Sequence, residues 1–351
     1  MRTTRIMQRS LIIVATSLAC CVFAQDVLAQ TDIVNMVSGP RIRGTIVSST
    51  PDQIVVNTDD GNKNVASWDV RLIRFEGSNE LVKAKSAYGD DRFSACYDQL
   101  NSLGSLDRDL MQQDADFYKA MSAARISLRG GKVTMDQAAT LLRQFMQSHP
   151  NSFHTYEVMD MFGDLAIATG RFDAAETQFA KTAACSWPEI SFNGTLKAGK
   201  AQLYSGKYDE AIASFKATER DDNGEAYAVQ AKLVARCLRA QALGLSGKTA
   251  EGMENANSII KNENSKNIEL FAHAYNALGT CYAKENKNKE AIRAFLHTDL
   301  LFTIEPDSHA QALYNLVELW AATERPDRAA RARQKLTERY RNTFWAAKLN
   351  N

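Results

Sequence analysis

A short phrase that returns at a nearly constant interval constrains the fold of this chain more than any other feature. In its best copies it reads Gly, a basic residue, Phe or Tyr, Asp, a small or acidic residue, and Ala. The steps between successive copies are 36, 41, 39 and 38 residues. A recurring unit of this length predicts an array of stacked helix pairs. The copies begin at Gly170, Gly206, Gly247, Asn286 and Glu324.

Three of the units also share a fixed spacing of glycine, alanine and phenylalanine. The glycine lies twelve residues before the alanine, and the phenylalanine lies four residues after it. Two helices approach closely only where both carry small residues, so the glycine and the alanine mark a helix crossing. We expect the phenylalanine to fill the space beneath it. The three sets are Gly163, Ala175 and Phe179; Gly199, Ala211 and Phe215; and Gly279, Ala291 and Phe295.

With its small residue, tight turn, alanine, aromatic residue and following proline, the unit resembles the tetratricopeptide repeat, whose usual length is 34 residues. The resemblance implies a mainly α fold, an α–α superhelix over residues 79–351. Two further copies, at Ala240/Gly252 and Val317/Ala329, lack the full pattern. Additional helix pairs are expected at Leu81–Leu103 and Asp114–Gln147. Proline opens first helices without loss of a needed hydrogen bond, and the candidates are Pro150, Pro188 and Pro306.

Residues 30–78 follow a period of two instead, with polar turns between apolar runs, which predicts a small all-β unit. So few short strands cannot hide both faces as an open sheet, and we expect them to curl into a barrel or to lean on the helices. Gly44, Ile46 and Asp52, followed by Ile54 to Val56, resemble the pattern of SH3-like and Sm-like barrels. The expected strands are residues 32–37, 41–48, 53–57, 63–66 and 71–75.

Barrels of this kind bind peptides, nucleic acid or cell-wall glycans. The alternative role is a cap that covers the open end of a helical stack. We favour the cap, because Trp68 stands alone in this segment and no aromatic cluster suits stacking.

Residues 1–29 have the three-part layout of a secretory signal peptide. Arginines at positions 2, 5 and 9 precede an apolar run at 11–23, and small residues follow. Cleavage after Ala29 is favoured over cleavage after Ala24, because Gln30 and Thr31 then lead into the first strand. Cys20 and Cys21 match a lipoprotein signal poorly. The expected location is therefore outside the inner membrane, in the periplasm or associated with the cell envelope.

Charge and cysteine spacing limit the partners of the mature chain. Beyond residue 29, basic and acidic residues nearly balance, 39 against 40, so nucleic acid and anionic lipid are not favoured. No later apolar run is long enough to span a bilayer. Four widely spaced cysteines favour buried thiols over a metal site and leave a disulfide open. They are Cys96, Cys185, Cys237 and Cys281.

No motif for catalysis, cofactor binding or metal binding is present. The five histidines form no metal-ligand pair, and neither a phosphate-binding loop nor a nucleophile motif occurs. Three acidic pairs, at 59–60, 90–91 and 221–222, fall in expected turns, where solvated carboxylates outnumber catalytic dyads. We therefore expect neither an enzyme nor a cofactor.

What remains for function is the concave face of the superhelix. By the register of the resemblance, first helices line this face, and their mixture of charge, amide and tyrosine suits a protein or peptide partner. The candidate residues of the concave face are Glu157, Asp160, Asp164, Asn193, Lys200, Tyr204, His273, Asn276, Lys284, Gln311, Tyr314 and Glu318.

The leading hypothesis is an exported scaffold or adaptor that binds a protein or peptide in the bacterial cell envelope. The alternative is a cell-wall glycan-binding protein that uses the β unit and keeps the repeats as support, and a third is an unrecognised hydrolase. The partner's identity and the oligomeric state stay open.

Overall fold

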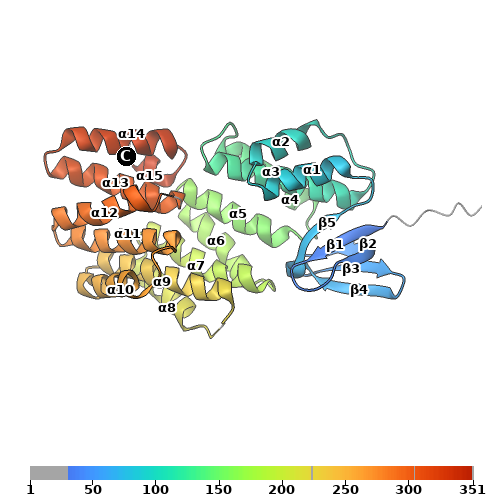
Figure 1. Cartoon of the computed structure of the whole chain (residues 1–351), viewed down its shortest axis with the longest axis horizontal. Helices are drawn as coiled ribbons and strands as arrows, with labels where there is room; N and C mark the ends of the chain where they lie inside the picture. Colours follow the sequence, from blue (N-terminus) through green and yellow to red (C-terminus); the bar gives the residue numbers. More distant parts are fainter. Residues whose placement is uncertain (1–30, 223, 304, 350–351) are drawn as a thin grey trace, which may run out of the picture.

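The computed structural model describes residues 31–222, 224–303 and 305–349; the expected signal peptide lies outside these ranges. Within them, a five-stranded antiparallel sheet is followed by fifteen α-helices (Figure 1). The strands are β1 (Asp32–Met36), β2 (Ile42–Ser49), β3 (Gln53–Thr58), β4 (Gly61–Ala66) and β5 (Val70–Arg74). A 3-10 turn at Ser67–Asp69 joins β4 to β5.

The strand order is β4-β3-β2-β1-β5, so β4 and β5 are the edges of the sheet. The register between β2 and β3 shifts at Ile46/Ser48, and that between β1 and β5 shifts at Asn35/Met36. Glycine is required at position 44, where β2 approaches β3, because a Cβ atom there would collide with the backbone oxygen of Asn57. The strands fall close to the expected ranges.

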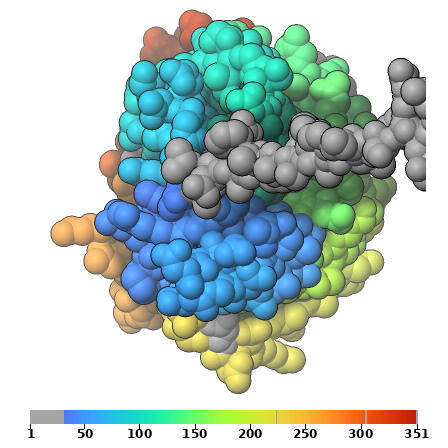
Figure 2. All heavy atoms as spheres, turned by 90° about the vertical axis from the view of Figure 1, so that its right-hand side faces the viewer, coloured from blue at the N-terminus to red at the C-terminus, as the bar shows by residue number. Residues whose placement is uncertain are grey.

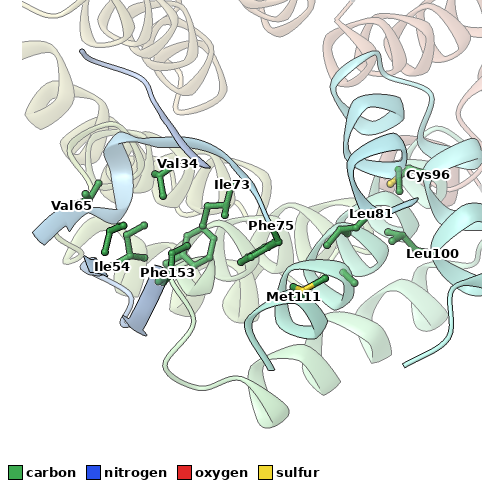
Figure 3. Close-up of a cluster of buried hydrophobic side chains, with 14 of the residues drawn as sticks. Val34, Ile54, Val65, Ile73, Phe75, Leu81, Cys96, Leu100, Met111 and Phe153 are labelled. Atoms are coloured by element: carbon green, nitrogen blue, oxygen red, sulfur yellow. The ribbon is translucent and has the colours of Figure 1, made fainter. Parts of the chain in front are cut away.

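The apolar face of the sheet is buried because it packs against the helices. Val34, Ile54 and Ile73 are buried in one cluster with Leu81 of α1 and with Phe153, which lies two residues before α5 (Figure 3). Burial of such a cluster is the main favourable term that fixes the sheet in place.

Polar contacts from three parts of the helical region also hold the sheet. Arg108 donates two hydrogen bonds to the buried carboxylate of Asp32, at 2.7 and 2.8 Å. Trp187 Nε1 donates to the Pro51 carbonyl at 2.8 Å, and the Phe153 amide donates to Ser49 Oγ at 3.2 Å. The sheet therefore packs directly on the helical region, and its atoms, drawn in blue, lie near the centre of the end view (Figure 2).

The helices follow as antiparallel pairs, as the repeated phrase predicts. The pairs at 81–103 and 114–147 are present as α1/α2 and α3/α4. Pro188 and Pro306 open α7 and α13, whereas Pro150 lies five residues before α5 and opens no helix. The helices are α1 (Asn79–Gly89), α2 (Phe93–Ser102), α3 (Asp109–Leu128), α4 (Met135–Ser148), α5 (Thr155–Ala168), α6 (Phe172–Ala183), α7 (Pro188–Tyr204), α8 (Tyr208–Arg220), α9 (Ala226–Leu245), α10 (Thr249–Asn262), α11 (Ile268–Lys284), α12 (Asn288–Leu301), α13 (Pro306–Ala322), α14 (Pro326–Arg339) and α15 (Phe344–Lys348).

Every copy of the repeated phrase begins at a residue with positive φ, between 57° and 90°. The next amide donates to a carbonyl five residues back, as Arg171 does to Ala166 at 2.8 Å. This is the hydrogen bond that closes a helix when the following residue takes the left-handed conformation, which glycine adopts without steric cost. Asn286 and Glu324 occupy the same position without being glycine. The phrase is thus a helix-ending signal.

The glycine–phenylalanine spacing also has the expected structural basis. An added Cβ at Gly199 would lie 2.7 Å from Phe215 Cε1, and one at Gly279 would lie 2.8 Å from Phe295 Cε2. Gly163 faces the ring of Phe179 in the same way. All three rings are fully buried. The aromatic ring therefore occupies the space that the missing side chain leaves.

The helical array returns to its own beginning. Arg341 donates to the Gly130 carbonyl at 2.6 Å, and Asn342 donates to the Ser127 carbonyl at 3.0 Å. Both carbonyls lie where α3 turns into α4, and both donors lie between α14 and α15. The view in Figure 1 agrees, with α13 and α14 beside the helices of the first pairs. The segment after α14 thus closes the superhelix.

Candidate functional site

The concave face is built by consecutive first helices, with α5, α7, α9, α11 and α13 in lateral contact. Apart from Glu157, which faces the sheet, the predicted residues fall into three groups on this face. Some form charge pairs between neighbouring helices, some are buried in the contact between α11 and α13, and some stay exposed.

The first group joins α5 to α7. Lys197 Nζ donates to Asp160 at 2.6 Å and to Asp164 at 3.0 Å. Burial alone would lower the pKa of Lys197, but the two carboxylates outweigh it and raise that pKa. Burial raises the pKa of Asp160 despite Lys197. Lys197 was absent from the predicted set, although it lies on the same helix as Lys200.

Asp307 at the start of α13 is the centre of a second charge pair. It pairs with Lys200 Nζ at 2.6 Å and accepts hydrogen bonds from Tyr204 Oη at 2.6 Å and from Trp345 Nε1 at 2.9 Å. Burial alone would raise the pKa of Asp307, but Lys200 and the donated hydrogen bonds lower it. The predicted residues Lys200 and Tyr204 therefore meet at one acceptor that the repeat register did not mark.

The α15 segment lies on the concave face. The ring of Phe344 packs against Tyr204, with centroids 6.0 Å apart, and edge-on against Phe172 at 4.9 Å. Trp345 is buried and contacts Tyr204 and Tyr314 at centroid distances of 5.1 and 5.7 Å. Part of this face therefore already holds a short aromatic helix.

Three predicted residues lie in the contact between α11 and α13. Asn276 Nδ2 donates to the Ser308 carbonyl at 2.8 Å and to Gln311 Oε1 at 3.1 Å. His273 Nδ1 lies 3.1 Å from Ser308 Oγ, and burial lowers the pKa of this imidazole. His273, Asn276 and Gln311 are at most 6% exposed, so they join repeats and are not open to a partner.

The remaining predicted residues lie apart from these networks. Lys284 and Glu318 are exposed, and Asn193 is half-buried. Glu157 faces the sheet instead, where its carboxylate lies 2.7 Å from His154 Nδ1. It lines a second hollow, which we call the β–α cleft, of about 750 Å³ between the sheet and α1, α3 and α5. Sequence reasoning missed this cleft, since its walls come from segments far apart in the chain.

No arrangement for metal or redox chemistry is found in the described ranges. They contain no group of three or more metal-ligating side chains, and no disulfide joins the four cysteines. The three acidic pairs lie in exposed turns and loops. No helix among the described residues is long and apolar enough to cross a bilayer.

Comparison with known proteins identifies the fold. No protein-family model and no curated protein matches the chain. A tetratricopeptide repeat protein from Parabacteroides merdae ATCC 43184 is similar in structure, with a TM-score of 0.54 and 15% identity, covering 74% of this chain and 91% of that one. NprR in complex with its cognate peptide NprX is also similar, with a TM-score of 0.54 and 13% identity, covering 77% of this chain and 81% of that one. The predicted tetratricopeptide-type repeat fold is confirmed.

Proposed function

We propose that this protein is an exported scaffold that binds a partner protein or peptide in the bacterial cell envelope through its concave face. The observation that carries the proposal is the packing of α15 on the concave face. The concave face holds this short helix with the rings of Tyr204 and Tyr314 and with the carboxylate of Asp307. Grooves that bind amphipathic helices do so with aromatic side chains and with a few buried polar groups that accept or donate hydrogen bonds.

The fold supports the same proposal. NprR was solved with a peptide bound, and a repeat array of this kind offers an extended surface without requiring catalytic groups. Lys284 and Glu318 are exposed on first helices, so both are open to a partner, and Glu318 lies at the margin of α15, where its carboxylate acts on Lys348. Export rests on the layout of residues 1–29.

The test uses the intact mature chain, because deleting the sheet would expose the apolar side chains that pack beneath it, among them Leu81 and Phe153. The chain beginning at Gln30 is used to capture partners from the native envelope fraction. The Lys284→Glu, Glu318→Lys double variant is compared with a control on the outer helix α12, Lys289→Glu with Glu290→Lys, whose residues are also exposed.

We expect a stoichiometric protein partner that the concave variant loses and the α12 variant keeps. Equal capture by both variants, or capture of glycan alone, would reject the concave face as the binding surface. Cell fractionation and the mass of the mature protein test export separately; an intact N-terminus and a cytoplasmic location would remove the envelope from the proposal.

A further inference from the structure

The β–α cleft has the size and lining of a binding site. Its volume of about 750 Å³ falls within the range of ligand pockets. The sheet contributes Arg41, Arg71 and Arg74, and the helices contribute Tyr88, Tyr118 and Glu157.

The floor of the cleft is a buried polar network whose charges compensate one another. Lys85 Nζ donates to the Ile73 carbonyl at 2.6 Å and forms an ion pair with Asp114. His154 lies 3.0 Å from Asp114 and 2.7 Å from Glu157. Because each group has a partner, the floor is a fixed, satisfied support.

The arginines on the sheet side are not compensated in this way. Arg41, Arg71 and Arg74 are exposed, and none forms an ion pair with another residue of the described ranges. The whole chain carries a formal net charge of only +1, so this is a local excess of positive charge. Three guanidinium groups around one hollow attract anions, and they bind carboxylates in a bidentate geometry.

The sheet side of the cleft is also an edge of the sheet. β5 is the last strand in the order, and the hydrogen bond from Lys85 to Ile73 shows that its outer edge faces α1. Edge strands accept extended peptides by main-chain pairing. At β5 the Ile73 carbonyl is already taken by Lys85, so a peptide would pair with the other outward-facing groups of the strand. Leu72, Val82 and Phe117 add apolar lining for side chains between the charges.

We propose that the β–α cleft binds an acidic peptide segment in an extended conformation beside β5. The carboxylates of Asp90 and Glu157 on the helix side disfavour a uniformly anionic polymer such as nucleic acid. The apolar lining further favours a peptide over a free anion. This site goes beyond the proposed function, because it lies apart from α15 and from exposed Lys284 and Glu318.

The site needs both parts of the protein. The arginines come from the sheet and its β1–β2 connection, whereas the tyrosines come from α1 and α3. The isolated β unit therefore lacks half of the cleft.

The experiment measures fluorescence anisotropy of a labelled peptide that alternates Glu with Leu, against an otherwise identical Gln/Leu peptide. The protein is the mature chain from Gln30. The test variant is Arg71→Glu with Arg74→Glu. The matched control, Arg43→Glu with Lys63→Glu, makes the same charge change at exposed sheet positions outside the cleft. Arg41→Gln supplies a milder test, and thermal midpoints check folding.

We expect the Glu peptide to bind at least about tenfold more tightly than the Gln peptide, and the test variant to lose at least about tenfold in affinity. The control should stay within about twofold, and binding should weaken between about 50 and about 300 mM NaCl. The concave variant Lys284→Glu, Glu318→Lys should bind the acidic peptide normally, which separates this site from the proposed function.

Equal binding of the two peptides would overturn the proposal, as would unchanged binding by folded Arg71→Glu, Arg74→Glu and Arg41→Gln proteins. Equal affinity for short DNA, or full displacement by millimolar inorganic phosphate, would also overturn it, since each would show a general anion surface.

Discussion

At the helix crossing of Gly163, the structure decides whether substitution by alanine raises or lowers the free energy of unfolding. A glycine-to-alanine change inside a helix ordinarily stabilises a protein by about 1 kcal/mol. At Gly163 the new methyl group would lie 2.6 Å from Phe179 Cζ and 2.9 Å from Cδ1, with Cε1 closer still. The ring is fully buried, so we expect any shift to disturb its packed neighbours.

Overpacking of a buried site costs about 1–3 kcal/mol, and three close ring atoms place this site toward the upper end. After the gain in helix propensity, we expect Gly163→Ala to destabilise the protein by about 1–2 kcal/mol. Gly89→Ala is the matched control, because nothing lies within 4 Å of the added atom. We expect the control to be neutral or to stabilise by up to about 1 kcal/mol.

The assay is urea unfolding followed by far-UV circular dichroism, with thermal midpoints as a second readout. Phe179→Leu removes the ring edge and alone costs about 1–2 kcal/mol for the cavity it leaves. Combined with Gly163→Ala, it should recover at least about 1 kcal/mol relative to the sum of the single changes. If Gly163→Ala stabilised the protein as Gly89→Ala does, or if the cycle showed no coupling, the ring would not lie under the crossing and the reasoning would be wrong.

Three further substitutions test the helix-ending turn at Glu324, the buried hydrogen bonds of His154, and the contact that holds α15 at Asp307. Glu324 holds a φ of 57° that glycine adopts without strain, so Glu324→Gly should raise the free energy of unfolding by up to about 1 kcal/mol in the same urea assay, and a loss would contradict the turn geometry. Burial alone would lower the pKa of His154, but its hydrogen bonds to Asp114 and Glu157 outweigh burial and raise it. The stabilisation is therefore complete below about pH 6.5 and is lost as pH rises through the folded-state pKa, so the advantage of the native protein over His154→Gln should shrink over that range; a constant advantage would refute this. Asp307→Asn weakens the charged acceptor of Trp345 and should cost about 1–3 kcal/mol and speed proteolysis after residue 340, and an unchanged cleavage rate would show that α15 is held by packing alone.

The sequence predicted those parts of the fold that depend on local rules. Strand ranges followed from alternation, and helix ends followed from the residues that accept a left-handed backbone. The pairing of Gly199 with Phe215 could be predicted because both belong to one repeat and recur elsewhere at the same spacing.

The candidate site was less predictable, because its features arise between repeats. The register marks the inward face of a first helix but does not show how closely the next first helix approaches. His273 and Asn276 therefore fit the concave register while being buried against α13. The α15 segment was not predicted because five residues show no helical period. Its aromatic pair, Phe344 and Trp345, and the N-cap residue Thr343 were the available signals.

The β–α cleft illustrates the same point across the two parts of the fold. Arg71 and Tyr118 are 47 residues apart in the sequence, and no motif links them. The docking of the sheet on the helices, through contacts that include the Asp32–Arg108 pair, brings their segments together.

The contacts of Arg341 and Asn342 with the α3–α4 turn change how this array responds to thermal fluctuation. An open repeat array frays from its terminal units, because each unit is supported on one side only. Here the unit at one end is supported by the other, across a separation of 211 residues between Gly130 and Arg341. Loss of any one helix pair therefore also strains that distant junction, so neighbouring and remote pairs should open together. The entropy of joining segments so far apart makes this junction a late event in folding. Once the junction is formed, we expect the helix pairs of this closed array to unfold together in one cooperative transition.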